Sequence, residues 1–245
     1  MKDRFSGHAP QYAAFRPHYP KELYDFIFRH VTNFDLAWDA GTGNGQAAVV
    51  LARHFMKVHA TDISKKQLEH AVLHPSINYA EEGYSTSLPD HSVDLITVAQ
   101  AIHWFDRQKF YDEAKRVGKP GAIIAVWGYG LLEVDKAIDL LISAFYVSVV
   151  GSYWDPERKH IDQHYAHIEF PFHEIPSPAF TMKFEWTLAE LEGYLTTWSA
   201  VQKYWKEVDE NPVPGLIAEF QPRWGSGKRA VRFPLFLRIG RIGNR

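Results

Sequence analysis

The stretch FDLAWDAGTGNG, residues 34–45, decides the fold of this chain. It begins as a short apolar run typical of a buried strand and ends in closely spaced glycines, after which a helical pattern continues to residue 55. Glycines between a strand and a helix let the backbone turn tightly and approach a ligand, which the helix N-terminus faces. The stretch therefore predicts a nucleotide-like ligand at the end of the first strand of an α/β sheet.

Further short apolar runs alternate with helix-like segments up to residue 130. Helices are predicted at 64–73 and 105–117, with Ser64 and Asp106 as N-caps. Continuous apolar runs separated by helices indicate a parallel sheet covered on both faces. We therefore expect a doubly wound α/β core, with the other strands at residues 56–62, 77–81, 93–99 and 122–127.

The chain outside this core is expected to form further units before and after it. We expect an α/β fold with a seven-stranded, mostly parallel sheet and a small helical and aromatic cap. The aromatic, irregular character of residues 152–178 is typical of a lid or binding loop. The predicted units are an N-terminal covering segment at 1–33, the cofactor-binding core at 34–130, a cap at 131–178 with a helix near 133–150, and a closing part at 179–245 with a strand at 179–186, a helix at 187–206 and a strand or hairpin at 229–242.

Composition excludes several classes of protein. The 245 residues carry 27 Lys and Arg against 29 Asp and Glu, a net charge of −2, so no global basic field draws the chain to nucleic acid or anionic lipid. The absence of cysteine excludes disulfides and Cys-ligated zinc. No signal-peptide pattern and no apolar run of bilayer-spanning length is visible. We expect a cytoplasmic protein with a small-molecule substrate and no nucleic-acid or membrane partner.

The negative charge beside the glycines limits the class of ligand that the loop can bind. Asp39 precedes Gly41, in a G-x-G-x-G spacing rather than the G-x-G-x-x-G of dinucleotide binders. A carboxylate there repels a pyrophosphate but attracts the ammonium and sulfonium of S-adenosylmethionine. Asp62 ends the next strand, where a carboxylate accepts the ribose hydroxyls of an adenosine, a feature shared with NAD enzymes. The loop favours a cationic nucleoside.

The sequence resembles the class I S-adenosylmethionine-dependent methyltransferases, which have a Rossmann-like fold. Within them it resembles the group similar to trans-aconitate methyltransferase. The matching stretches are YAAFRPHYP, DAGTGNG, ATDIS, LPDHSVDLITVAQAIHWFD and GAIIAVWGY. The resemblance implies S-adenosylmethionine as cofactor. It implies these cofactor contacts: Asp39, Gly41, Gly43 and Gln100 around the methionine part, Asp62 at the ribose, Glu82 and Gly83 at the adenine, and Tyr12, Arg16 and Tyr19 closing the N-terminal side.

Methyl transfer from a sulfonium needs in-line placement of the acceptor, and a base only if the acceptor holds a proton. A carboxylate acceptor, which the resemblance implies, needs no base but does need cationic or hydrogen-bonding groups. A nitrogen or hydroxyl acceptor would use His103 as the candidate catalytic base, although we favour a positioning or packing role for it. Trp104, Trp127 and Tyr129 are expected to wall the substrate pocket.

Two other functions stay open. One is an NAD(P)-dependent oxidoreductase on a similar fold, and the other is a nucleic-acid-directed methyltransferase or an inactive cofactor sensor. His160, His164 and His167 have the spacing of one helix face, but the reaction needs no metal and we expect none. The basic residues between Arg223 and Arg245 are interpreted as a solvated strand edge protected by charge.

Overall fold

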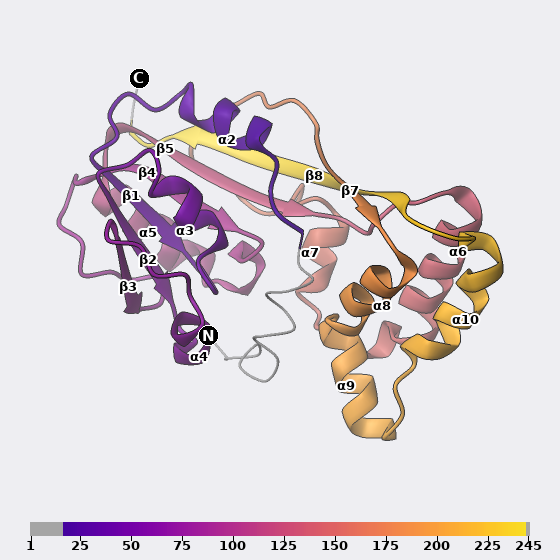
Figure 1. The fold of residues 1–245 in the computed structure, drawn as a ribbon. Coiled ribbons are helices and arrows are strands. Elements are labelled where there is room, and N and C mark those ends of the chain that lie inside the picture. The colour runs from indigo at the N-terminus through magenta and orange to yellow at the C-terminus, as the bar shows by residue number, and fades with distance from the viewer. Residues whose placement is uncertain (1–16, 244–245) are drawn as a thin grey trace.

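The computed structural model describes residues 17–243. Its centre is an eight-stranded sheet with the order β3-β2-β1-β4-β5-β8-β6, and β7 pairs with β8 beside this path (Figure 1). The strands are β1 (Leu36–Ala40), β2 (Lys57–Asp62), β3 (Ile77–Glu81), β4 (Val93–Ala99), β5 (Gly118–Tyr129), β6 (His173–Ile175), β7 (Phe180–Trp186) and β8 (Arg229–Arg241).

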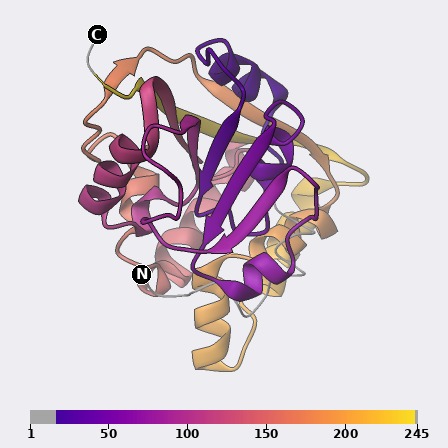
Figure 2. The same cartoon turned by 90° about the vertical axis from the view of Figure 1, so that its left-hand side faces the viewer.

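Strands β1 to β5 are parallel, and β8 runs antiparallel to β5. Figure 2 shows the purple strands of this half running side by side. Because the strand order reverses between β1 and β4, the carboxyl ends of these strands flank the crevice where open α/β sheets bind ligands. The predicted fold class is confirmed, with eight strands instead of seven. The short β6 lies in residues 152–178, where the sequence shows no strand periodicity.

Both faces of the sheet are covered, as the continuous apolar runs predict. Neighbouring residues of one strand point to opposite faces, so Ala37 joins one core cluster and Trp38 the other. The first cluster contains residues of α2 (Lys21–Phe28) and α3 (Gln46–Leu51), and the second contains residues of α5 (Arg107–Val117). The sheet is therefore a buried layer between helices.

The predicted N-caps are confirmed. The Ser64 hydroxyl accepts a hydrogen bond from the Gln67 amide at the start of α4 (Lys65–Glu69). The Asp106 carboxylate accepts one from the Lys109 amide at the start of α5. Each cap satisfies a helix N–H that has no partner within the helix.

A helical unit lies beyond the sheet, where β7 and β8 extend toward the right of Figure 1. It consists of α6 (Lys136–Ala144), α8 (Leu188–Thr196), α9 (Ser199–Val208) and α10 (Val213–Trp224), with η2 (Phe145–Val149), η3 (Gly151–Tyr153) and α7 (Arg158–Asp162) leading back toward the sheet. The single helix predicted at 187–206 is wrong: the backbone of Trp198 is extended, and the chain forms two helices. The break lets the Trp198 ring pack against Tyr146, Trp154 and Tyr194.

Candidate active site

The glycine loop after β1 has left-handed backbone at Gly41, Gly43 and Gly45. A Cβ at Gly41 would lie 2.7 Å from the Ala101 Cβ, so packing requires a glycine there. Among residues 17–243, a Cβ at Gly43 would meet nothing closer than the Gln67 side chain at 4.0 Å. The Gly43 backbone is therefore open to a ligand, which fits the close approach expected of a nucleoside cofactor.

Asp39 lies beneath this loop and is fully buried. Its carboxylate accepts hydrogen bonds of 2.6 Å from the hydroxyls of Thr42 and Thr97. Burial raises the pKa of Asp39 to about 6, although both hydroxyls oppose the shift. The structure thus shows Asp39 ordering the loop through Thr42, while its contact with the cofactor stays a prediction.

Asp62 at the end of β2 is held by two backbone amides. One carboxylate oxygen accepts a hydrogen bond from the Gly43 amide at 2.9 Å, and the other accepts from the Ser64 amide at 2.8 Å. These two bonds orient the carboxylate. This orientation beside Gly43 fits the predicted ribose contact.

Glu82 and Gly83 follow β3 at the same edge. The Glu82 carboxylate is bonded to Nε2 of the buried His59 at 2.9 Å and accepts from the Ser87 amide. Partial burial acts to raise the pKa of Glu82, but these hydrogen bonds outweigh it and leave the pKa below its usual value. Glu82 is thus an ionised group fixed to β2, and its contact with adenine stays a prediction.

Gln100 joins the ends of β4 and β5. Its backbone is left-handed, and its amide N–H donates to the Trp127 carbonyl at 2.8 Å. Its side-chain oxygen accepts from the Tyr129 amide at 3.0 Å. Gln100 therefore sets the direction in which the chain leaves β4, toward η1 (Ile102–Trp104).

Two of the aromatic residues expected in the substrate pocket lie deeper than predicted. Trp127 is completely buried and Tyr129 nearly so. Tyr19 packs against both rings, with centroid distances of 5.5 and 6.5 Å. The three rings thus pack together beside the segment that leads into α2, and the place of Trp127 and Tyr129 in a substrate pocket stays a prediction. The predicted contacts Tyr12 and Arg16 lie outside the described residues.

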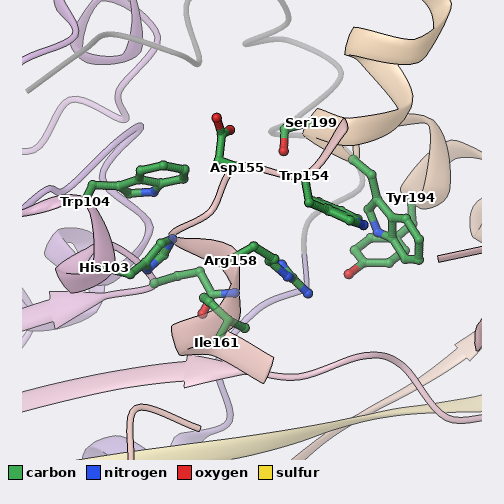
Figure 3. A pocket seen from close by; sticks show the side chains of 10 residues that line it. His103, Trp104, Trp154, Asp155, Arg158, Ile161, Tyr194 and Ser199 are labelled. Carbon is green, nitrogen blue, oxygen red and sulfur yellow. The ribbon is translucent and has the colours of Figure 1, made fainter. Parts of the chain in front are cut away.

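A pocket opens where the chain leaves β4, and we call it the β4 pocket. It is open to solvent: the space in it that no atom fills, open solvent included, is about 540 Å³, and its cavity volume is about 60 Å³. Ala101 touches the glycine loop at Gly41, and the residues after it enter the pocket, so the two sites are neighbours. The lining residues, most of them labelled in Figure 3, are Gln100, His103, Trp104, Trp154, Asp155, Arg158, Ile161, Tyr194, Trp198 and Ser199.

Arg158 is the cation among the described residues that line the β4 pocket. Its guanidinium lies over the rings of Trp154 and Tyr146, at 4.8 and 5.6 Å from their centroids. Its Nε donates to the Tyr146 hydroxyl at 2.9 Å and lies 3.4 Å from Asp162. No sequence signal pointed to this residue, because it comes from the stretch without periodicity.

His103 also lines the pocket and is 5% exposed. Its Nδ1 lies 3.0 Å from the Tyr165 hydroxyl. Burial, with the charge of Arg158 and of His160 acting in the same direction, lowers the pKa of His103 to about 3. His103 is therefore neutral near neutral pH and is a weak base.

No group of three His, Cys, Asp or Glu within residues 17–243 is arranged to hold a metal ion. His164 and His167 lie beyond the end of α7 at Asp162, so they do not share a helix face with His160. Over the same range, no helix combines the length and the apolar character needed to cross a bilayer.

The strand order, the glycine loop and the carboxylate at the end of β2 are typical of a nucleoside-binding α/β enzyme, and comparison with known proteins identifies its family. The model of the methyltransferase domain family matches residues 38–126. A protein of Dictyostelium discoideum named as a methyltransferase is 33% identical over 96% of this chain and 93% of its own length. The chain belongs to the class I S-adenosylmethionine-dependent methyltransferases, and S-adenosylmethionine is its methyl donor.

Two further comparisons agree. A solved structure titled as a type II methyltransferase from Anaeromyxobacter dehalogenans has 35% identity and a TM-score of 0.87, covering 94% of this chain and 100% of that one. An uncharacterized methyltransferase of Mycobacterium tuberculosis is 31% identical over 52% of this chain and 53% of its own length. The family assignment favours a methyltransferase over the oxidoreductase that the sequence left open.

Proposed function

We propose that this methyltransferase acts on a small molecule that binds in the β4 pocket and presents a carboxylate to the methyl group. The observation that carries the proposal is Arg158. An arginine is always protonated, and its planar donors match a carboxylate. Because the Nε edge already faces Tyr146 and Asp162, the Nη groups are the donors that suit a ligand.

The other charges of the pocket support an anionic acceptor. Asp155 forms an ion pair of 2.8 Å with Lys203, so its negative charge is balanced locally. Four aromatic rings, those of Trp104, Trp154, Tyr194 and Trp198, line the pocket together with Arg158. This lining suits a compact organic acid with an apolar body better than a nucleic-acid strand, whose binding relies on many exposed cations.

The proposed mechanism is transfer by positioning. S-adenosylmethionine would supply a methyl group bound to a sulfonium, whose sulfur is a good leaving group. The residues at the ends of β1 to β3 would hold the nucleoside: Gly43 by close backbone approach, Asp62 at the ribose, and Glu82 with Gly83 at the adenine. Arg158 would orient the carboxylate for in-line attack. No base is required, which agrees with a His103 pKa of about 3.

The test is methyl transfer from labelled S-adenosylmethionine to aromatic and aliphatic carboxylic acids, with the matching amides and alcohols beside them. We expect methylation of acids only. Arg158→Gln should raise the KM for the best acid by about 10- to 100-fold, as loss of a charged hydrogen bond implies. Its affinity for S-adenosylhomocysteine should not change.

The matched control is Lys159→Gln, which removes the exposed neighbouring cation on the same helix. It should behave like the wild type. Methylation of amines or alcohols with the acids inert, or an Arg158→Gln variant with the wild-type KM, would refute the proposal.

A further inference from the structure

Tyr165 and His103 are joined by a buried hydrogen bond beside the β4 pocket. Tyr165 is 1% exposed and follows α7 in a left-handed turn with His164. Its ring packs edge-on against Phe236 of β8 at 4.9 Å, and its carbonyl accepts a hydrogen bond from Arg238 at 3.2 Å. The sheet thus fixes the phenol in place, and the phenol in turn fixes one nitrogen of His103.

The positions of the protons decide which of the two groups donates in this hydrogen bond. Within residues 17–243, the phenol oxygen of Tyr165 has no hydrogen-bond partner other than His103 Nδ1. Burial raises the pKa of Tyr165 well above its usual value, so the phenol keeps its proton. A buried O–H left without an acceptor is costly, so Tyr165 donates and Nδ1 accepts. A neutral imidazole whose Nδ1 accepts carries its proton on Nε2.

We propose that Tyr165 is a positioning residue that holds His103 as the Nε2–H tautomer, so that His103 donates a hydrogen bond to the acceptor molecule and does not remove a proton from it. The proposal rests on the proposed function, since it takes the β4 pocket as the acceptor site. Donors from Arg158 and His103 would then serve one substrate group. Such a group needs several lone pairs and no proton, which describes a carboxylate that enters already ionised.

The surroundings keep His103 in this state. The charged and titratable groups around it are Tyr165, Arg158 and His160, together with Asp155 and Tyr194, which line the same pocket. Arg158 and His160 both disfavour a proton on His103, while Lys203 balances the charge of Asp155. Figure 3 shows His103 and Arg158 on adjoining sides of the pocket.

The experiment is ¹⁵N NMR of imidazole-labelled protein saturated with S-adenosylhomocysteine. Loss of one histidine signal set in His103→Gln assigns the ring among the 13 histidines. We expect His103 to show a protonated Nε2 and an unprotonated Nδ1, unchanged from pH 5.5 to 8. In Tyr165→Phe this single-tautomer signature should give way to a mixture.

The control is Tyr111→Phe, which removes another buried phenol, the donor to the Glu169 carbonyl. It should leave the His103 tautomer unchanged. A protonated Nδ1 in the wild type, or a signature that survives Tyr165→Phe, overturns the inference.

A second titration with benzoate separates this inference from the proposed function. Benzoate should shift the Nε2–H signal of His103 in the wild type and fail to do so in Arg158→Gln. A locked tautomer with no response to benzoate counts against the pocket as the acid site, and with it against the donor role. A mixture of tautomers in a wild-type protein that still binds benzoate refutes the role of Tyr165 and leaves the proposed acid site standing.

Discussion

Thr97 on β4 lies opposite Asp39 on β1 in the parallel register, and its hydroxyl donates a hydrogen bond of 2.6 Å to the buried Asp39 carboxylate. Thr42 of the glycine loop donates to the other oxygen of the same carboxylate. One carboxylate therefore connects the cofactor loop to the strand that leads to the β4 pocket. We therefore expect a change at this carboxylate to affect both the loop and β4.

Replacing Thr97 with the isosteric valine tests that connection. Thr97→Val should lower the free energy of unfolding by about 1 to 3 kcal/mol, because it leaves a buried carboxylate with one donor fewer. The pKa of Asp39 should rise further, since this hydroxyl opposes the effect of burial. Urea unfolding at pH 7 measures the loss. Thr181→Val, at an exposed position of β7, is the control, and an equal loss in both variants would contradict the prediction.

The first two glycines of the loop, Gly41 and Gly43, allow a matched comparison. Gly41→Ala and Gly43→Ala both place a Cβ on left-handed backbone, but only the first meets the Ala101 Cβ at 2.7 Å. Gly41→Ala should therefore be less stable by about 1 to 3 kcal/mol than Gly43→Ala. Gly43→Ala should fold but bind S-adenosylhomocysteine at least about tenfold more weakly. Calorimetric titration measures the affinity, and wild-type binding by Gly43→Ala would place the cofactor elsewhere.

Asp62→Asn should weaken binding of S-adenosylhomocysteine by about 1 to 3 kcal/mol, because charged hydrogen bonds to the ribose are lost. The substitution also disturbs the bond from the Gly43 amide, so affinity alone does not isolate the ribose contact. The sharper measurement is the preference for adenosine over 2′,3′-dideoxyadenosine. The wild type and the exposed control Asp112→Asn should keep this preference, while Asp62→Asn should lose most of it. An undiminished preference in Asp62→Asn would argue against the assignment.

The buried His103 predicts how stability changes with pH. The folded protein holds this imidazole neutral down to a pKa of about 3, whereas the unfolded chain protonates it near the ordinary value of about 6.5. The unfolded state thus binds one more proton between these values, and the folded state loses stability as pH falls through that window. Between pH 6 and pH 4, the wild type should lose about 1.4 kcal/mol per pH unit more than His103→Gln. Urea titrations at both pH values check this, and parallel losses would be inconsistent with a buried neutral histidine.

The core of the fold was predictable because its signals are local. Continuous apolar runs gave the parallel strands, the residues Ser64 and Asp106 gave two helix starts, and glycines marked the loop. The helical unit was less accessible to sequence reasoning. At the break, Trp198 packs against four rings, three of which come from the distant residues 145–154. The short β6 is paired only with the distant strand β8 among the described residues.

The sequence by itself determined the nucleoside-binding edge, since the carboxyl ends of parallel strands converge whatever the distant chain does. Only the tertiary structure brought Arg158 and Tyr165 from the irregular stretch to His103, which is about 60 residues away along the chain. It also decided that Asp39 is buried against two threonines. The physical reason is that hydrogen bonding and burial of a side chain depend on partners that are distant in the sequence, whereas strand and helix periodicity does not.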